Sequence, residues 1–166
     1  MEFEIISKML DGENPETFFE VGCGSGGLSD RITGGLDLKP GKAHFMEWNA
    51  EKIPWPLKDN SQDIVFTVGT LLLIPDPYPI IKEMLRICKD KIIIAEVQDD
   101  SKSDYGEARN FITQEVQILD KNSKQPSNFY DSRIARDYKK VFKNLGLDYQ
   151  LIDGVGGKTI FKCKKM

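Results

Sequence analysis

Residues 17–27 have the sequence TFFEVGCGSGG, in which a short apolar run leads into four glycines. An apolar run that stops at glycines predicts a strand followed by a tight turn, and residues 28–32 then begin a helical segment. Glycine has no Cβ, so the backbone can turn sharply there and approach a ligand closely. Exposed N–H groups and a helix N-terminus favour a polar or anionic group. The stretch therefore predicts a nucleotide-type ligand, with a turn that holds no ligand as the alternative.

Two features of this turn favour different ligands. Gly22, Gly24 and Gly27 fit the GxGxxG pattern of dinucleotide-binding turns. Glu20, however, precedes the first glycine by two positions, where its carboxylate can meet a ligand ammonium but would repel a pyrophosphate. The turn alone leaves both kinds of ligand open.

The following residues alternate between predicted strands and a predicted helix. Residues 62–68 and 91–97 are runs rich in β-branched side chains, as is typical of parallel strands buried on both faces. Between them, residues 78–88 carry apolar side chains at helical spacing. Strands that alternate with helices predict a doubly wound α/β sheet.

The C-terminal third predicts a helix and then a hairpin. Residues 131–144 place their apolar side chains on one helical face. Residues 148–152 and 159–163 are predicted strands, joined by the glycine-rich residues 153–157. A hairpin at this point would add an antiparallel strand to an otherwise parallel sheet.

One polar stretch interrupts this pattern. Residues 99–128 are irregular, and a long loop in a compact domain is often an active-site lid. We predict that this loop, together with residues 1–14, covers the substrate. Since there is no internal repeat and no boundary in composition, residues 1–166 are predicted to form one domain, with residues 1–16 as a short N-terminal segment.

Five ordered motifs resemble those of class I (Rossmann-like) S-adenosylmethionine-dependent methyltransferases with a type 11-like domain. The glycine turn resembles the family's first motif, (D/E)xGxGxG, and four more segments follow in the family's order. They resemble its second strand ending in an acidic residue, its D-A-E-x-L-P-F segment, its D-x-S-F-D-x-V strand entry and its E-x-x-R-V helix: Gly34–Leu38, Asn49–Trp55, Asp59–Val65 and Glu83–Ile87.

The resemblance implies a seven-stranded, mostly parallel sheet with an antiparallel C-terminal strand, and S-adenosylmethionine as the cofactor. Only ten residues separate Gly26 from Asp37 and eleven separate Asp37 from Asn49, so the helices around the second and third strands are expected to be trimmed. In the family, the second-strand carboxylate binds both ribose hydroxyls. The implied cofactor-binding residues are Glu20, Gly22, Cys23, Gly24, Gly26, Asp37, Leu38, Asn49, Ala50 and Thr67.

The sequence departs from the family at two positions. Asn49 stands where the family usually has Asp, and Leu73 stands where many relatives have His. The lone histidine, His44, lies beyond Asp37 and away from the expected methyl group, so it is interpreted as a surface or packing residue. Glu96, Asp99 and Asp100 lie where open α/β sheets place ligands, but we assign no catalytic base and leave the catalytic residues open.

Composition and charge bear on partners and compartment. The net charge is −3, without the basic surface that nucleic acid requires, so nucleic acid is disfavoured and a small molecule such as a sugar or metabolite is favoured as acceptor. Three scattered cysteines (Cys23, Cys88 and Cys163) argue against a metal cluster and for a reducing, cytoplasmic location. No apolar run is long enough to span a membrane.

Two alternatives remain at this point. A non-catalytic S-adenosylmethionine-binding or assembly protein would explain the trimmed helices, Asn49 and Leu73. An NAD-dependent oxidoreductase would explain the glycine turn, but 166 residues leave little room for its substrate domain.

Overall fold

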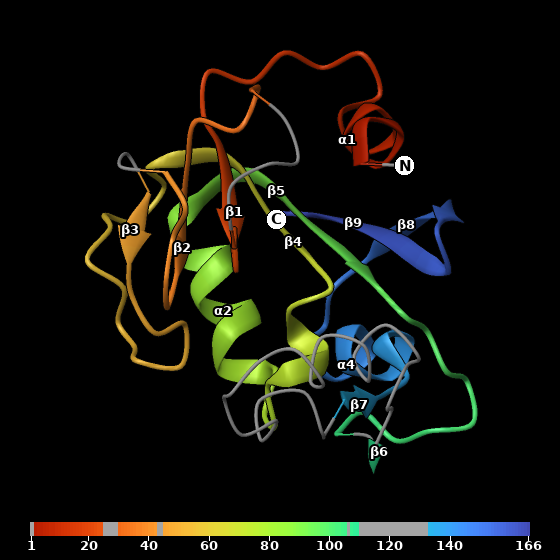
Figure 1. Ribbon diagram of the computed structural model, residues 1–166. Helices are drawn as coiled ribbons and strands as arrows, with labels where there is room; N and C mark the ends of the chain where they lie inside the picture. The colour runs from red at the N-terminus through yellow and green to blue at the C-terminus, as the bar shows by residue number, and fades with distance from the viewer. Residues whose placement is uncertain (1, 25–29, 43–44, 106, 110–132) are drawn as a thin grey trace, which may run out of the picture.

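The computed structural model describes residues 2–24, 30–42, 45–105, 107–109 and 133–166, and seven of its strands form one sheet (Figure 1). The strand order is β3-β2-β1-β4-β5-β9-β8. The strands span Phe18–Val21 (β1), Gly34–Asp37 (β2), Met46–Glu47 (β3), Gln62–Val68 (β4), Cys88–Glu96 (β5), Tyr149–Val155 (β8) and Lys158–Lys164 (β9).

The direction of the strands confirms the predicted sheet. β1 to β5 pair in parallel, whereas β9 runs antiparallel between β5 and β8. Ile92, Ile93, Ile94 and Ala95 of β5 are completely buried, as expected for a central strand covered on both faces. The first switch in strand order lies between β1 and β4, so ligands are expected beyond the carboxyl ends of these strands.

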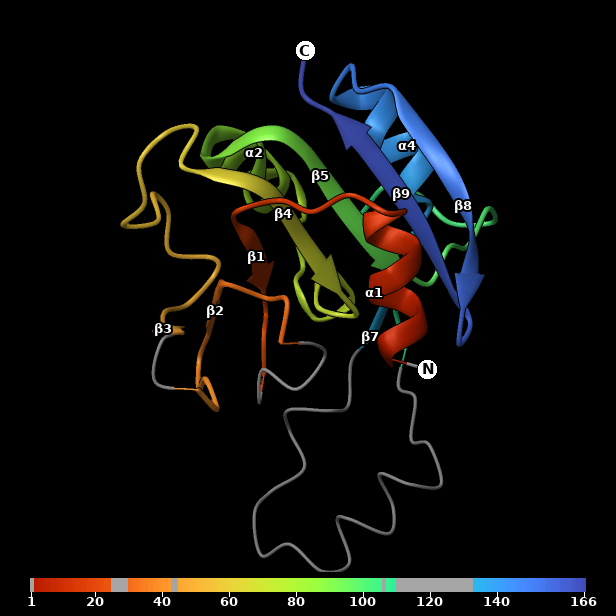
Figure 2. The ribbon, with the colours of Figure 1, turned by 90° about the horizontal axis from the view of Figure 1, so that it is seen from above.

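Helices cover both faces of the sheet. α2 (Tyr78–Ile87) and α4 (Tyr138–Asn144) pack on one face, and α1 (Glu2–Leu10) packs on the other (Figure 2). The predicted helix over residues 78–88 is confirmed to within one residue. It forms because Ile80, Ile81, Met84 and Ile87 all fall on its buried side, while Pro77 and Pro79 at its start need no helical N–H partner.

The connections around β2 are short, as predicted. No helix occurs among the described residues between β1 and β3. Residues 39–42 form a bend, and the Gly41 N–H donates to the Gly24 carbonyl at 2.9 Å. The second crossover therefore passes close to the glycine turn, and its described residues 38–42 and 45 contain no helix. Gly26 and His44 lie outside the described residues.

The predicted helix over residues 131–144 begins too early. Arg133–Ala135 form the strand β7, which pairs antiparallel with β6 (Glu107–Arg109), and the helix starts only at Tyr138. Asp137 stops the helix from extending backwards, because its extended backbone and its side chain, which accepts the Lys139 N–H, form an N-cap. Most of the predicted lid, residues 106 and 110–128, lies outside the described residues.

The C-terminal hairpin is confirmed, but its turn is tighter than predicted. β8 continues to Val155, so only Gly156 and Gly157 connect it to β9. Their φ angles of 60° and 76° belong to the type I′ turn that suits a two-residue hairpin, and this turn favours glycine.

The N-terminal segment contributes to the core. Ile5, Ile6, Met9 and Leu10 of α1 are at most 4% exposed and pack with side chains of the central strands. This helix thus covers the face of the sheet opposite α2 and α4, near β8 and β9 (Figure 2). That residues 1–14 also act as a lid stays a prediction. None of the described helices is both long and apolar enough to cross a membrane.

Candidate functional site

The glycine turn after β1 has a backbone that only glycine adopts readily. Gly22 and Gly24 have φ angles of 75° and 50°, in the left-handed region. The N–H groups of Gly22 and Cys23 both donate to the Leu36 carbonyl of β2, at 2.8 and 3.1 Å. A Cβ on Gly22 would overlap Thr70, whose Oγ1, Cγ2 and Cβ all lie too close to it. The turn therefore contacts both neighbouring strand ends, and glycine is required for that contact.

Asp37, the last residue of β2, points its carboxylate to this turn. Oδ2 accepts the Gly24 N–H at 3.0 Å, and Oδ1 accepts the Lys39 N–H at 3.0 Å. Each oxygen keeps acceptor capacity, and the side chain is only partly buried. Asp37 is thus held in one orientation and can still accept hydrogen bonds from a ligand hydroxyl.

A cleft of about 210 Å³ opens between the glycine turn, the end of β2 and two loops. Five of the predicted cofactor-binding residues line it. The structure also adds six residues that the sequence did not single out for this site. The predicted members are Gly22, Asp37, Leu38, Asn49 and Ala50, and the added ones are Leu36, Trp48, Glu51, Thr70, Leu73 and Ile74.

Residues 70–75, which we call the wall segment, form one side of this cleft. The segment follows β4 and contains the 3₁₀ helix η1 (Leu71–Leu73). Leu73 is 44% exposed, and Ile74 is almost buried. A single 3₁₀ turn has no sequence periodicity, so the pattern of the chain did not predict that this segment lines the site, although Leu73 is a departure from the family.

The opposite loop, residues 48–57, is held by indole and carboxylate hydrogen bonds. Trp55 Nε1 donates to the Ala50 carbonyl and Trp48 Nε1 to the Lys52 carbonyl, both at 2.8 Å. The Trp55 N–H donates to Glu83 Oε1 at 2.7 Å, and Glu83 pairs with Arg86 at 2.6 Å. The motif that resembles E-x-x-R-V therefore anchors this loop to α2. Within the loop, Asn49 Oδ1 accepts the Glu51 N–H at 2.9 Å.

Glu20 and Cys23 lie behind the turn. Glu20 is 2% exposed, and its Oε2 has no hydrogen-bond partner within the described part of the chain. Burial, with a smaller contribution from Asp37, raises the pKa of Glu20 from 4.5 to about 8. Burial likewise raises the pKa of the Cys23 thiol to about 12, so this cysteine stays protonated and is not a nucleophile.

Thr67 belongs to the predicted set but does not line the cleft. Its side chain is completely buried, and its hydroxyl donates to the Val21 carbonyl at 3.0 Å. Its side chain therefore joins β4 to β1.

The acidic residues after β5 also differ in their surroundings. Glu96 is completely buried and accepts the Leu71 N–H at 2.7 Å. Asp99 accepts from Ser101, and Asp100 pairs with Lys139 at 3.1 Å, so these two residues stabilise the local turn and α4. Among the described residues after β5, these contacts do not identify a catalytic base.

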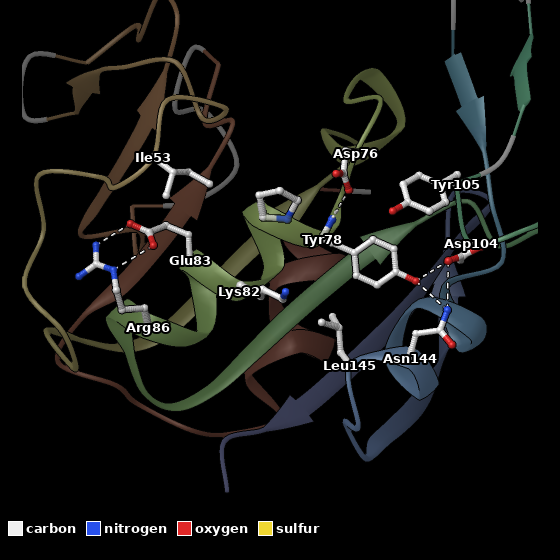
Figure 3. A pocket seen from close by; sticks show the side chains of 11 residues that line it. Ile53, Asp76, Tyr78, Lys82, Glu83, Arg86, Asp104, Tyr105, Asn144 and Leu145 are labelled. Atoms are coloured by element: carbon white, nitrogen blue, oxygen red, sulfur yellow. Dashed lines mark hydrogen bonds and ion pairs between the residues drawn. The ribbon is translucent and has the colours of Figure 1, made fainter.

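A larger hollow of about 1,040 Å³ lies between α2 and α4 (Figure 3). Tyr78 Oη donates to Asp104 and accepts from Asn144 Nδ2 at 2.8 Å, and Glu83 faces Arg86. These side chains are hydrogen-bonded to one another, and the hollow contains none of the predicted cofactor-binding residues. The smaller cleft, which is lined by Gly22 of the glycine turn and by Asp37, is therefore the candidate cofactor site.

Comparisons with known proteins agree with this geometry. Residues 19–94 match a family model described as a methyltransferase domain. A comparison with curated protein sequences gives no match.

Similar solved structures establish the fold. One is an S-adenosylmethionine-dependent methyltransferase from Thermotoga maritima, a possible histamine N-methyltransferase, at 18% identity, covering 99% of this chain and 88% of that one, with a TM-score of 0.63. Another is magnesium protoporphyrin IX methyltransferase from Synechocystis PCC 6803 with bound SAH, at 14% identity, covering 99% of this chain and 82% of that one, with a TM-score of 0.63. A third is a putative S-adenosylmethionine-dependent methyltransferase from Listeria monocytogenes, at 13% identity, covering 99% of this chain and 96% of that one, with a TM-score of 0.64.

Residues in the cleft and beside it fit the chemistry of such a cofactor. Asp37 offers a fixed carboxylate for hydroxyl donors, and Glu20 has a buried oxygen without a partner among the described residues. Gly24 leaves open space where a Cβ would stand. Residues 19–94 thus match a methyltransferase domain, the fold is that of the similar solved methyltransferases, and the features of the cleft fit S-adenosylmethionine as a cofactor.

Proposed function

We propose that this enzyme methylates a small-molecule acceptor, such as a sugar or metabolite, with the cofactor bound in the cleft beside the glycine turn. The observation that carries the choice of cleft is the pairing of the Gly22–Gly24 turn with Asp37, whose carboxylate is held by the Gly24 N–H. In this proposal Asp37 accepts hydrogen bonds from both ribose hydroxyls. Leu38 and Ala50 contact the adenine, and Asn49 offers its carbonyl oxygen to the adenine amino group.

The remaining predicted residues contribute from the turn and from behind it. The left-handed backbone of Gly22 and Gly24 allows the chain to approach the ligand closely. Glu20 supplies a carboxyl group near the amino-acid part of the ligand, where an ammonium favours its ionised form. Cys23 fills space beside Gly35, and Thr67 keeps the ends of β1 and β4 together. Gly26, which lies outside the described residues, is proposed to continue the same turn.

The protein mainly supplies orientation and exclusion of water. When bound, S-adenosylmethionine would supply an electrophilic methyl group, and S-adenosylhomocysteine, a neutral thioether, would be the leaving group. Asp37 and the glycine turn fix the position from which the methyl group is presented, while Leu38, Leu73 and Ile74 line the cleft with apolar surface. We assign no residue to deprotonation of the acceptor.

Charge favours a small molecule over nucleic acid as the acceptor. The cleft is lined by Asp37 and Glu51, and no Lys or Arg is among its described lining residues. The whole chain carries a net charge of −3. Proteins bind the phosphate backbone of nucleic acids through clustered Lys and Arg side chains, so the acidic lining of this cleft would repel an RNA acceptor. The three free, buried thiols suit a reducing compartment, and we propose a cytoplasmic location.

Transfer of a labelled methyl group tests the proposal. The purified protein is incubated with methyl-labelled S-adenosylmethionine and either a deproteinised small-metabolite extract, total RNA or total protein. We expect label in the metabolite fraction, and we expect the Asp37→Ala variant to lose it. Label in RNA or protein alone would contradict the choice of acceptor class. Calorimetric binding of NADH but not of S-adenosylhomocysteine would contradict the cofactor site as well.

A further inference from the structure

The wall segment, residues 70–75, is held by two buried ionisable side chains that do not line the cleft. From β5, Glu96 Oε1 accepts the Leu71 N–H at 2.7 Å. From the other side, Arg136 Nη1 donates to the Leu71 carbonyl at 2.6 Å and Nη2 donates to the Ile74 carbonyl at 2.8 Å. Both residues are completely buried. The peptide groups of Leu71 are therefore fixed on both sides, by an acceptor and by a donor.

Burying the Arg136 guanidinium costs desolvation free energy, which its hydrogen bonds must offset. A buried guanidinium must satisfy its donors, and Arg136 does so almost entirely with backbone carbonyls: those of Leu71, Ile74, Pro75 and Tyr105, besides the Tyr138 hydroxyl. An apolar side chain would fill this space without any charge to desolvate. The planar fork of arginine instead fixes several carbonyls in one relative position.

The held segment contacts the glycine turn directly. Thr70, its first residue, lies against Gly22 so closely that a Cβ there would overlap the Thr70 side chain. Thr70 Oγ1 also donates to the Val21 carbonyl at 3.3 Å. At the other end of the segment, Leu73 and Ile74 line the cleft. A displacement of the Leu71 peptide would therefore change the distance between the two sides of the cleft.

Arg136 also joins this segment to the chain beyond β5. Its Nη2 donates to the Tyr105 carbonyl at 3.3 Å, and its own carbonyl accepts the Asp99 N–H at 3.2 Å. Arg136 directly follows β7, and β7 packs against η1. Arg136 thus contacts the wall segment and Tyr105 through its side chain, and Asp99 through its backbone carbonyl.

We propose that Glu96 and Arg136 are positioning residues of the cofactor cleft, which hold residues 70–75 at the separation from the glycine turn that the cofactor requires. The inference rests on the proposed location of the cofactor site. Neither side chain touches the ligand in this proposal. Both act through the backbone of Leu71 and Ile74, and Arg136 links that backbone to residues 99–105.

Four variants and one control test the proposal. Arg136→Met and Glu96→Leu remove the hydrogen bonds, Arg136→Lys keeps a charge without the fork, and Glu96→Gln keeps the acceptor for Leu71. Val141→Ala is the control, because Val141 is equally buried in α4 but makes no hydrogen bond to residues 70–75. Binding of S-adenosylhomocysteine is measured by calorimetry, with the stoichiometry reporting the folded fraction.

We expect Arg136→Met and Glu96→Leu to raise the dissociation constant about tenfold or more, while Glu96→Gln stays within about threefold of the parent chain. Val141→Ala should lower the melting temperature but leave the dissociation constant of the folded fraction unchanged. Dissociation constants for Arg136→Met and Glu96→Leu equal to that of Val141→Ala would overturn the proposal. If Arg136→Met does not fold, Arg136→Lys and the Glu96 pair decide, because they change less volume.

Hydrogen exchange separates this inference from the proposed function. In Glu96→Leu and Arg136→Lys, the backbone amides of residues 70–74 should exchange about tenfold faster, while those of β4 stay as in the parent chain. Unchanged exchange at residues 70–74 would overturn the positioning role whether or not the cofactor binds. Failure of the parent chain to bind S-adenosylhomocysteine would instead contradict the proposed cofactor site.

Discussion

Replacing Gly22 by alanine perturbs the contact between the glycine turn and the wall segment. The added Cβ would lie 2.5 Å from Thr70 Cγ2 and 2.8 Å from Thr70 Cβ, so the side chain or the turn must move. Alanine must also adopt a φ of 75°. The left-handed backbone costs about 1–2 kcal/mol, and overpacking costs about 1–3 kcal/mol more. We therefore expect a loss of about 2–5 kcal/mol in the free energy of unfolding.

Gly24 supplies a matched control for this substitution. Its φ of 50° is also left-handed, but an added Cβ there meets no atom within 4 Å. Gly24→Ala should therefore cost only the backbone contribution of about 1–2 kcal/mol. Urea unfolding of both variants measures the difference, which we attribute to Thr70. Removing the Thr70 side chain as Thr70→Gly in the Gly22→Ala background should recover that difference.

The binding of S-adenosylhomocysteine by the same variants extends the test. Gly22→Ala should bind more weakly than the parent chain, because the turn and the wall segment can no longer approach each other. The reasoning would be refuted if Gly22→Ala were no less stable than Gly24→Ala. It would equally be refuted if Thr70→Gly failed to couple to Gly22→Ala in a double-mutant cycle.

Two further predictions concern the carboxylates of the site. Asp37→Ala should weaken S-adenosylhomocysteine binding by more than about 1 kcal/mol, measured calorimetrically, because it removes the acceptor for two hydroxyls; an unchanged dissociation constant would show that the ribose lies elsewhere. Glu20 has a folded-state pKa of about 8 against an ordinary 4.5, so between these pH values the folded chain binds the proton that the unfolded chain releases. The free energy of unfolding of the ligand-free protein should therefore fall as pH rises from 5 to 8, with Glu20 contributing at most about 1.4 kcal/mol per pH unit. Thermal melts of Glu20→Gln should lack this contribution. Parallel profiles of melting temperature against pH for the two proteins would contradict the prediction.

The parts of the fold that follow from local pattern were predictable. The β-branched runs at residues 62–68 and 91–97 became central strands, because continuous apolar runs are buried whatever their neighbours. The helix over residues 78–88 was predictable from the spacing of its apolar side chains. The tight turn after β1 was predictable from its glycines, two of which have a left-handed backbone. The antiparallel C-terminal strand was expected from the hairpin at the end of the chain.

Features that depend on distant contacts could not be predicted in this way. Ile134 and Ala135 have helical spacing with later residues, yet they form β7 because β6 pairs with them and Asp137 caps the helix. The sequence around Thr67 does not indicate which way its hydroxyl points. The pairing of β1 with β4 brings the Val21 carbonyl within hydrogen-bonding distance of that hydroxyl. Arg136 follows an irregular stretch, and its partners lie more than sixty residues earlier in the chain.

The most direct test of the cofactor site is a crystal structure of the protein grown with S-adenosylhomocysteine. We predict that the ribose hydroxyls lie within hydrogen-bonding distance of the Asp37 carboxylate, with the glycine turn and residues 70–75 on either side of the ligand. A ligand bound instead in the hollow between α2 and α4, against Tyr78 and Asn144 (Figure 3), would contradict the account.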